Sequence, residues 1–278
     1  MKIKYGDLPE TYIECFEKLS QASLAADLEY MLVGATARDL VFENVYGIQS
    51  PRRTYDIDIS LYVNSWGKFE EFKAALEEIG FSSNPKTAHK MSFSPSNSEE
   101  MLQLDLVPFG PISDVNGDIS WPPGFDFKMS VLGFEEAFRS KLIVDTNKDT
   151  KIPVVSIEGL FLLKVIAWIE RGYGARKKDA EDLFFILQNY EYLDGMRESL
   201  FNEIDAEHFD FDLTKISVAK LAREVGQICT EQTYKYINSK LINDDREEIL
   251  EQLANEMSTN PALNLSKLII FRDIFKPQ

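Results

Sequence analysis

The feature that most constrains this chain is a glycine turn followed, 22 residues later, by a strand that carries two aspartates. In YMLVGATARDLVF, residues 30–42, a short apolar run ends at Gly34 and a helix-forming segment follows. In TYDIDISLYV, residues 54–63, Asp56 and Asp58 alternate with apolar residues, so both carboxylates lie on one face of the predicted strand. Two carboxylates at i and i+2 are about 7 Å apart along a strand, and burying them without a cation costs several kcal/mol each. The pattern therefore predicts a cation site on the polar face of this strand.

A third carboxylate completes the predicted site. Asp105 lies inside the apolar strand LQLDLVP, where Leu104 and Leu106 face one side and Asp105 faces the other. Hard oxygen ligands suit Mg²⁺, which proteins usually hold with a few carboxylates together with substrate phosphates. The three aspartates are therefore predicted to bind Mg²⁺ or Mn²⁺.

The glycine turn supplies the other half of the predicted chemistry. A strand, a glycine and a helix start expose backbone N–H groups toward an anion, and the helix dipole favours phosphate at this position. Thr36 adds a hydroxyl donor and Arg38 adds a cation. A phosphate site beside a metal-binding aspartate pair predicts nucleotidyl transfer from a nucleoside triphosphate, in which metal ions orient the triphosphate and neutralise the leaving pyrophosphate.

The order of predicted elements indicates an α+β chain of two parts, with a mixed α/β domain over 1–155 and a helical domain over 156–278. The first part alternates helices and strands, and residues 110–128 are rich in Gly, Pro and Asp and contain an Asn-Gly turn signal. The second part has helical periodicity throughout. The predicted helices are 9–28, 35–42, 66–80, 157–171, 176–190, 192–203, 214–228, 231–241, 244–257 and 262–275, and the predicted strands are 29–34, 54–63, 89–94, 101–109, 140–145 and 151–156.

These motifs resemble the DNA polymerase β-like nucleotidyltransferase superfamily, in which a glycine turn, an Asp-x-Asp strand and a later lone Asp recur. GATARDLVF and RRTYDIDIS, together with LLKVIAWIERGYGARKKDAEDLFFIL, look most like the AbiEii-type nucleotidyltransferases. That resemblance covers roughly residues 30–190. It implies a polymerase β-like core and a toxin of a toxin–antitoxin or phage-abortive system that works with an antitoxin protein.

Carried over by position, the resemblance implies a role for each motif residue. The three aspartates would be catalytic and hold the metal, with Asp105 as the ligand or base that activates the acceptor. The residues that would contact the nucleotide or the acceptor are Gly34, Ala35, Thr36, Arg38, Lys164, Lys178 and Asp182. The acceptor would be RNA, most plausibly a tRNA end, or a protein side chain.

Two departures from the family pattern keep alternatives open. The family turn is usually Gly-Gly or Gly-Ser, whereas this chain has Gly34-Ala35, which leaves open a degenerate fold that only binds nucleotide or a partner. GATARDL also resembles the turn of CCA-adding enzymes, although their later arginine-rich motifs are not found. A further alternative is nucleotidyl transfer to a cationic small molecule such as an antibiotic.

Charge and composition limit the partners. The formal net charge of −16 argues against a wide nucleic-acid surface, so any nucleic acid must be bound locally, and it would suit a cationic substrate. The segment 164–178 runs against this trend with a net charge of +4, either as a solvated turn or as a contact for triphosphate or acceptor. With no membrane-length apolar run and no secretory signal, a cytoplasmic protein is expected.

Overall fold

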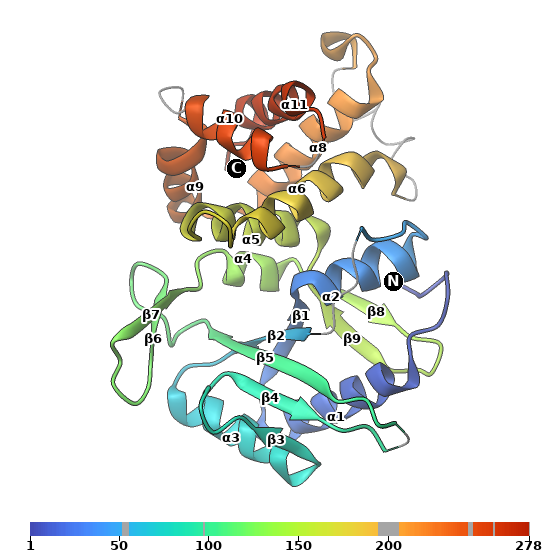
Figure 1. Cartoon of the computed structure of the whole chain (residues 1–278), viewed down its shortest axis with the longest axis vertical. Helices are drawn as coiled ribbons and strands as arrows, with labels where there is room; N and C mark the ends of the chain where they lie inside the picture. The colour runs from blue at the N-terminus through green and yellow to red at the C-terminus, as the bar shows by residue number, and fades with distance from the viewer. Residues whose placement is uncertain (52–55, 97, 194–205, 244–246, 258, 278) are drawn as a thin grey trace. The chain divides into compact units, whose positions relative to one another are not determined.

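The protein has an α+β fold, which confirms the predicted fold class (Figure 1). The computed structural model describes residues 1–51, 56–96, 98–193, 206–243, 247–257 and 259–277. The chain divides into two compact units, Met1–Ser156 and Ile157–Gln278. The first contains a mixed sheet with helices, and the second is helical.

The first unit consists of two β-sheets and four α-helices among its described residues. The larger sheet has seven strands in the order β3-β4-β5-β2-β1-β9-β8, and β6 and β7 form a separate hairpin. The strands of the first unit are β1 (Glu29–Val33), β2 (Asp56–Tyr62), β3 (Phe81–Ser83), β4 (Lys90–Phe93), β5 (Leu102–Phe109), β6 (Asp118–Trp121), β7 (Phe127–Ser130), β8 (Leu142–Asp145) and β9 (Lys151–Val154). Its helices are α1 (Glu10–Ala26), α2 (Gly34–Asp39), which continues into a π-helical turn (Leu40–Val45), α3 (Trp66–Glu78) and α4 (Phe134–Arg139).

The centre of the large sheet is formed by β1, β2 and β5, and this arrangement places the aspartates. β2 is antiparallel to β1 and parallel to β5, so β2 pairs with a neighbour on each side. The side chains of Ile57 and Ile59 are completely buried, whereas Asp56 is exposed and Asp58 half-buried. The alternation of polar and apolar residues in the sequence therefore gives β2 one apolar and one polar face.

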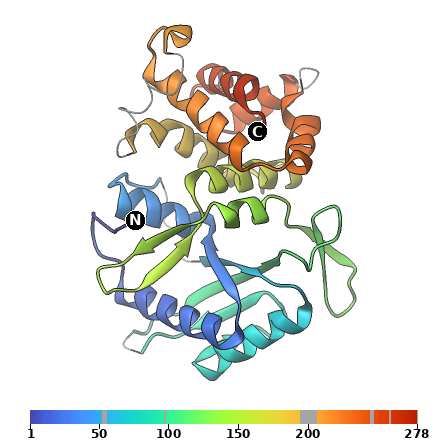
Figure 2. The same ribbon diagram turned by 180° about the vertical axis from the view of Figure 1, so that it is seen from behind.

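Two helices, α1 and α3, lie side by side and cover one face of the large sheet (Figures 1 and 2). In α3, Phe69, Phe72 and Leu76 recur at helical spacing and are completely buried. The helix starts at Trp66, where the Ser65 side chain accepts a hydrogen bond from the backbone N–H of Lys68. These helices leave the polar face of β2 available for the predicted site.

The segment 110–130, which begins with the turn-rich residues 110–128, contains two short strands that were not predicted. Asp118–Trp121 and Phe127–Ser130 pair as an antiparallel hairpin, with Trp121 opposite Phe127. Gly, Pro and Asp concentrate before β6 and in the turn between β6 and β7, so the sequence did not predict these two strands of four residues each. Trp121 is buried against Trp66, Phe69 and His89, so its indole ring is packed in the core rather than presented to solvent.

The second unit is built from helices whose apolar faces form its core. Its α-helices are α5 (Ile157–Glu170), α6 (Lys177–Asn189), α8 (Leu213–Ile228), α9 (Glu231–Ile237), α10 (Glu247–Glu256) and α11 (Pro261–Ile274), and its short helical turns are Tyr190–Tyr192, Glu207–Phe209 and Asn238–Ile242. The predicted helix 192–203 lies almost entirely outside the described residues. Among the described helices, none is long and apolar enough to cross a membrane.

Candidate active site

The β2–β5 pair brings two of the predicted carboxylates directly opposite each other. In the parallel register of β2 and β5, Asp58 faces Asp105, and Asp56 faces Gln103. Since residues paired in register point to the same face, Asp56, Asp58 and Asp105 share the polar face of the sheet. Like charges placed opposite each other destabilise a sheet, so this pairing requires a compensating cation.

One such cation is Lys90, which the sequence analysis did not single out. Lys90 begins β4, and the antiparallel register of β4 and β5 places it opposite Asp105. The Lys90 Nζ lies 3.0 Å from Asp105 Oδ1 and 3.2 Å from Asp105 Oδ2. The hydrogen bond to Asp105 raises the pKa of Lys90, and the negative charges of Asp105, Asp56 and Asp58 raise it further against the opposing effect of burial. The lysine is therefore a cation within the field of all three aspartates.

The glycine turn contacts the aspartates directly. Gly34 has a φ of +72°, in the left-handed region that side chains of L-residues rarely adopt. A Cβ atom built on Gly34 would lie 2.1 Å from Asp58 Oδ2 and 2.8 Å from Asp58 Cγ. The absence of a side chain at this position therefore makes the room that the Asp58 carboxylate occupies. The neighbouring Ala35 is half-buried at the start of α2.

Thr36 and Arg38, both predicted to contact phosphate, have protein partners in this structure. The Thr36 hydroxyl donates a hydrogen bond of 2.7 Å to the backbone carbonyl of Asp56, which ties α2 to the start of β2. Arg38 is completely buried, and its Nε and Nη2 donate to Asp39 Oδ1 at 2.9 and 2.6 Å. Burial raises the pKa of Asp39, against the lowering effect of Ser50 and Arg38. Thr36 therefore ties the turn to the strand that carries the aspartates, whereas Arg38 is paired with its neighbour Asp39.

The remaining predicted site residues, Lys164, Lys178 and Asp182, belong to the second unit. Lys164 Nζ lies 2.7 Å from Asp182 Oδ2 and 3.1 Å from Asp179 Oδ1, and Arg171 Nη1 lies 2.7 Å from Asp179 Oδ2. The side chains of Asp179 and Asp182 are 0% and 1% exposed. This buried ion network joins α5 to α6. Asp179 was missed by the sequence analysis, although it lies in the same KKDAED motif.

The basic segment 164–178 is only partly a solvated turn. Arg176 stacks over the ring of Trp168 at 4.6 Å and forms a two-pronged hydrogen bond to Glu256. Lys177 and Lys178 are exposed at the start of α6. Lys164, Arg171 and Arg176 are therefore each paired with carboxylates of their own unit.

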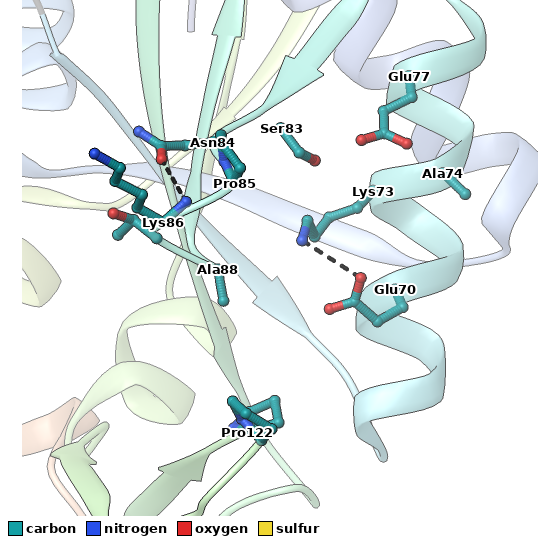
Figure 3. Close-up of a pocket in the computed structure, with 12 residues that line it drawn as sticks. Glu70, Lys73, Ala74, Glu77, Ser83, Asn84, Pro85, Lys86, Ala88 and Pro122 are labelled. Atoms are coloured by element: carbon teal, nitrogen blue, oxygen red, sulfur yellow. Dashed lines mark hydrogen bonds and ion pairs between the residues drawn. The ribbon is translucent and has the colours of Figure 1, made fainter.

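A cavity of about 500 Å³ lies between α3, the segment 83–88 and the start of the β6–β7 turn (Figure 3). The residues that line it include Glu70 and Glu77 together with Lys73 and Lys86, and Lys73 points across the cavity while hydrogen-bonding Glu70 at 3.4 Å. Its charges balance, and none of the predicted site residues lines it. A smaller cavity of about 380 Å³ lies beside Thr36, and the residues that line it include the acidic Asp7, Asp39, Glu43 and Glu100.

The donor set fits a divalent cation. Carboxylate oxygens are the ligands that Mg²⁺ and Mn²⁺ prefer, three carboxylates share one face, and Gly34 leaves room for the carboxylate of Asp58. In the described part of the chain, no three His, Cys, Asp or Glu side chains are already gathered as metal ligands. Metal binding would therefore require these carboxylates to turn toward one ion.

Comparison with known proteins identifies the family. The family described as "Nucleotidyl transferase AbiEii toxin, Type IV TA system" matches residues 16–263, which is most of the chain. No curated protein matches the sequence.

Several solved structures are similar to this chain at low identity. An antigenic nucleotidyltransferase-like protein from Paracoccidioides brasiliensis is 16% identical, with 76% of this chain and 94% of that chain covered and a TM-score of 0.45. The enzyme ANT(2")-Ia in complex with adenylyl-2"-tobramycin is 14% identical (82% and 98% covered, TM-score 0.36). The Thermotoga maritima CCA-adding enzyme with tRNA is 13% identical (95% and 79% covered, TM-score 0.32).

At these TM-scores the solved structures carry no argument about chemistry, and the family match carries the assignment. It confirms the resemblance inferred from the glycine turn, the Asp-x-Asp strand and the later helical motif, and it extends well past residue 190. The chain belongs to the AbiEii family of nucleotidyltransferase toxins of type IV toxin–antitoxin systems.

Proposed function

We propose that this protein transfers a nucleoside monophosphate from a nucleoside triphosphate to an acceptor hydroxyl on RNA, at the end of a tRNA. The observation that carries the proposal is the pairing of Asp58 with Asp105 across β2 and β5, with the Gly34 turn packed against the Asp58 carboxylate. A protein side chain is the other acceptor class that the family leaves open. Growth inhibition would follow from the modified acceptor, and a cognate antitoxin would relieve it.

The chain's own residues have distinct roles in this proposal. Asp56, Asp58 and Asp105 would hold Mg²⁺ or Mn²⁺, which when bound supplies charge neutralisation for the triphosphate and the leaving pyrophosphate. The backbone N–H groups of the turn at Gly34 and Ala35 would face the phosphates. Thr36 would position Asp56 through its bond to the Asp56 carbonyl, and Asp105 would accept the proton of the acceptor hydroxyl.

The second unit carries exposed positive charge of its own. The exposed Lys177 and Lys178, at the start of α6, offer positive charge on a chain whose net charge is −16, in line with local rather than extensive contact to RNA. Lys164 and Asp182 would act through the buried network that fixes α5 against α6. Since nucleoside triphosphates and tRNA are cytoplasmic, the reaction would take place in the cytoplasm.

A thermal-shift experiment tests the nucleotide site first. Each nucleoside triphosphate is added with and without Mg²⁺ to the wild type and to Asp58→Asn, which keeps the size of the side chain but removes its charge. A ligand at a hundredfold its Kd adds about 2.7 kcal/mol to the unit that binds it. For a unit of this size, that corresponds to a rise of several degrees. A Mg²⁺-dependent rise that is absent in Asp58→Asn is expected, and no rise with any nucleotide would contradict a preformed site.

The acceptor is tested separately with labelled nucleotide, total tRNA and purified protein. Label in tRNA that depends on Asp58 is expected, together with growth arrest on expression that Asp58→Asn abolishes. Label in protein and not in RNA would assign the other acceptor class.

A specific observation also favours a second candidate function, transfer to a cationic small molecule. Four acidic residues line the cavity beside Thr36, and neither Lys nor Arg is among the described residues that line it. A cationic acceptor of modest size would be attracted there. Drug resistance without growth arrest on expression would support this candidate over the first.

A further inference from the structure

The Lys90–Asp105 pair has a geometry that bears on how the site takes up metal. Lys90 Nζ lies 3.0 and 3.2 Å from the two carboxylate oxygens of Asp105, so the ammonium contacts both of them. The Lys90 side chain is 41% exposed and the Asp105 side chain 25% exposed. The pair therefore lies at the surface of the site, where the Lys90 side chain can rotate into solvent.

The position of the pair follows from strand registers rather than from flexible side chains alone. β5 is flanked by β2 and by β4, and Asp105 is in register with Asp58 on one side and with Lys90 on the other. The three residues thus form one row across three adjacent strands. A carboxylate lies in the middle of this row, with a second carboxylate on one side and an ammonium on the other.

The Asp105 carboxylate cannot fully bind both the Lys90 ammonium and a metal ion at the same time. Mg²⁺ binds its oxygen ligands at about 2.0–2.1 Å and requires near-octahedral geometry. An ammonium held by the same two oxygens competes for the lone pairs and repels the incoming ion. Without metal, however, the ammonium offsets the repulsion between Asp58 and Asp105.

We propose that Lys90 is a positioning residue that acts as a built-in counter-ion, occupying Asp105 until a divalent metal displaces it. This inference rests on the proposed function only in taking Asp56, Asp58 and Asp105 as the metal ligands. Metal uptake is then an exchange of one cation for another on Asp105. The metal-free sheet keeps its central register because the row of charges is never left as carboxylates alone.

The test measures Mn²⁺ affinity directly, by titration calorimetry and by the electron paramagnetic resonance signal of free Mn²⁺, without nucleotide or acceptor. Lys90→Met removes the ammonium and keeps an unbranched side chain of similar length. The matched control is Lys128→Met, which removes a lysine of the same unit whose Nζ lies 3.8 Å from Asp114. An exposed ion pair of this kind corresponds to a change of about two- to fivefold in affinity.

Four results are expected together. Lys90→Met binds Mn²⁺ about two- to fivefold more tightly than the wild type, whereas Lys128→Met binds it unchanged. Lys90→Arg, which keeps the positive charge, binds Mn²⁺ as weakly as the wild type or more weakly. In an Asp105→Asn background, Lys90→Met has no effect, because the competition runs through Asp105. Lys90→Gln provides a second neutral variant if Lys90→Met does not fold.

Weaker Mn²⁺ binding by Lys90→Met would overturn the inference, since it would mean that Lys90 assists metal binding. An effect equal to that of Lys128→Met would overturn it too, because only the general charge would then matter. Absence of Mn²⁺ binding in both the wild type and Lys90→Met would refute it regardless of enzymatic assays. If Mn²⁺ binds and Lys90→Met tightens it, but no nucleotidyl transfer is found, the inference stands and the proposed function falls.

Discussion

Gly34→Ala is the substitution for which the structure predicts the sharpest result. The Gly34 backbone has a φ of +72°, and an alanine Cβ there would lie 2.1 Å from Asp58 Oδ2 and 3.0 Å from Asp58 Cβ. Separations below 3.0 Å cannot be tolerated, so either the turn or the carboxylate must move. Because Ile57 and Ile59 fix the β2 backbone in the core, we expect the Asp58 side chain to move.

The expected loss of stability has two parts. An alanine in the left-handed conformation costs about 1–2 kcal/mol. Forcing the Asp58 side chain away from its preferred rotamer adds about 0.5–1.5 kcal/mol. Gly34→Ala should therefore lower the free energy of unfolding of the first unit by about 1.5–3.5 kcal/mol.

The chain offers a matched control in Gly6, which has a φ of +63° but whose added Cβ would meet nothing closer than Asn44 Nδ2, at 3.9 Å. Gly6→Ala carries the backbone cost without the collision. It should lose about 1–2 kcal/mol and keep the affinity for Mn²⁺ unchanged.

Metal affinity separates the two variants more clearly than stability does. Disturbing the surroundings that orient a metal ligand typically costs 10–100-fold in affinity, so Gly34→Ala should bind Mn²⁺ at least about tenfold more weakly than the wild type. Denaturant unfolding and Mn²⁺ titration measure the two quantities on the same samples. The reasoning would be refuted by a Gly34→Ala protein that binds Mn²⁺ within twofold of the wild type and is no less stable than Gly6→Ala.

Two further predictions concern stability. The buried Tyr30 hydroxyl hydrogen-bonds Ser20 at 2.9 Å, and burial raises its pKa to about 12, whereas an unfolded tyrosine ionises near pH 10. Its stabilising contribution is therefore complete below pH 10 and is lost as the pH rises toward 12, so between pH 9 and 11 the wild type should lose about 1.4 kcal/mol more than Tyr30→Phe. Equal losses in denaturant unfolding at the two pH values would contradict this. In the second unit, Lys164→Met leaves Asp179 and Asp182 buried without this ammonium and should cost about 3 kcal/mol in the same assay. A cost below about 1 kcal/mol would show that the network contributes little.

The sequence by itself determined the features that depend on short-range pattern. Alternation in β2 placed Asp56 and Asp58 on the face opposite the buried isoleucines, because successive strand residues point to opposite sides. Helical spacing of apolar residues located α1, α3 and most helices of the second unit. Gly34 was recognisable as a turn, since a short strand ends there and a helix begins.

Only the tertiary structure decided which residues meet across the sheet. Lys90 lies opposite Asp105 because of the register of β4 and β5, which residues 94–101 connect, and a connection of that length leaves the register open in the sequence. In the same way, the charge of Arg38 predicted a phosphate contact, whereas in the fold Arg38 is buried and donates hydrogen bonds to Asp39. The polar residues of β2 could be predicted from local pattern, whereas their partners depend on pairings between distant segments that no local pattern encodes.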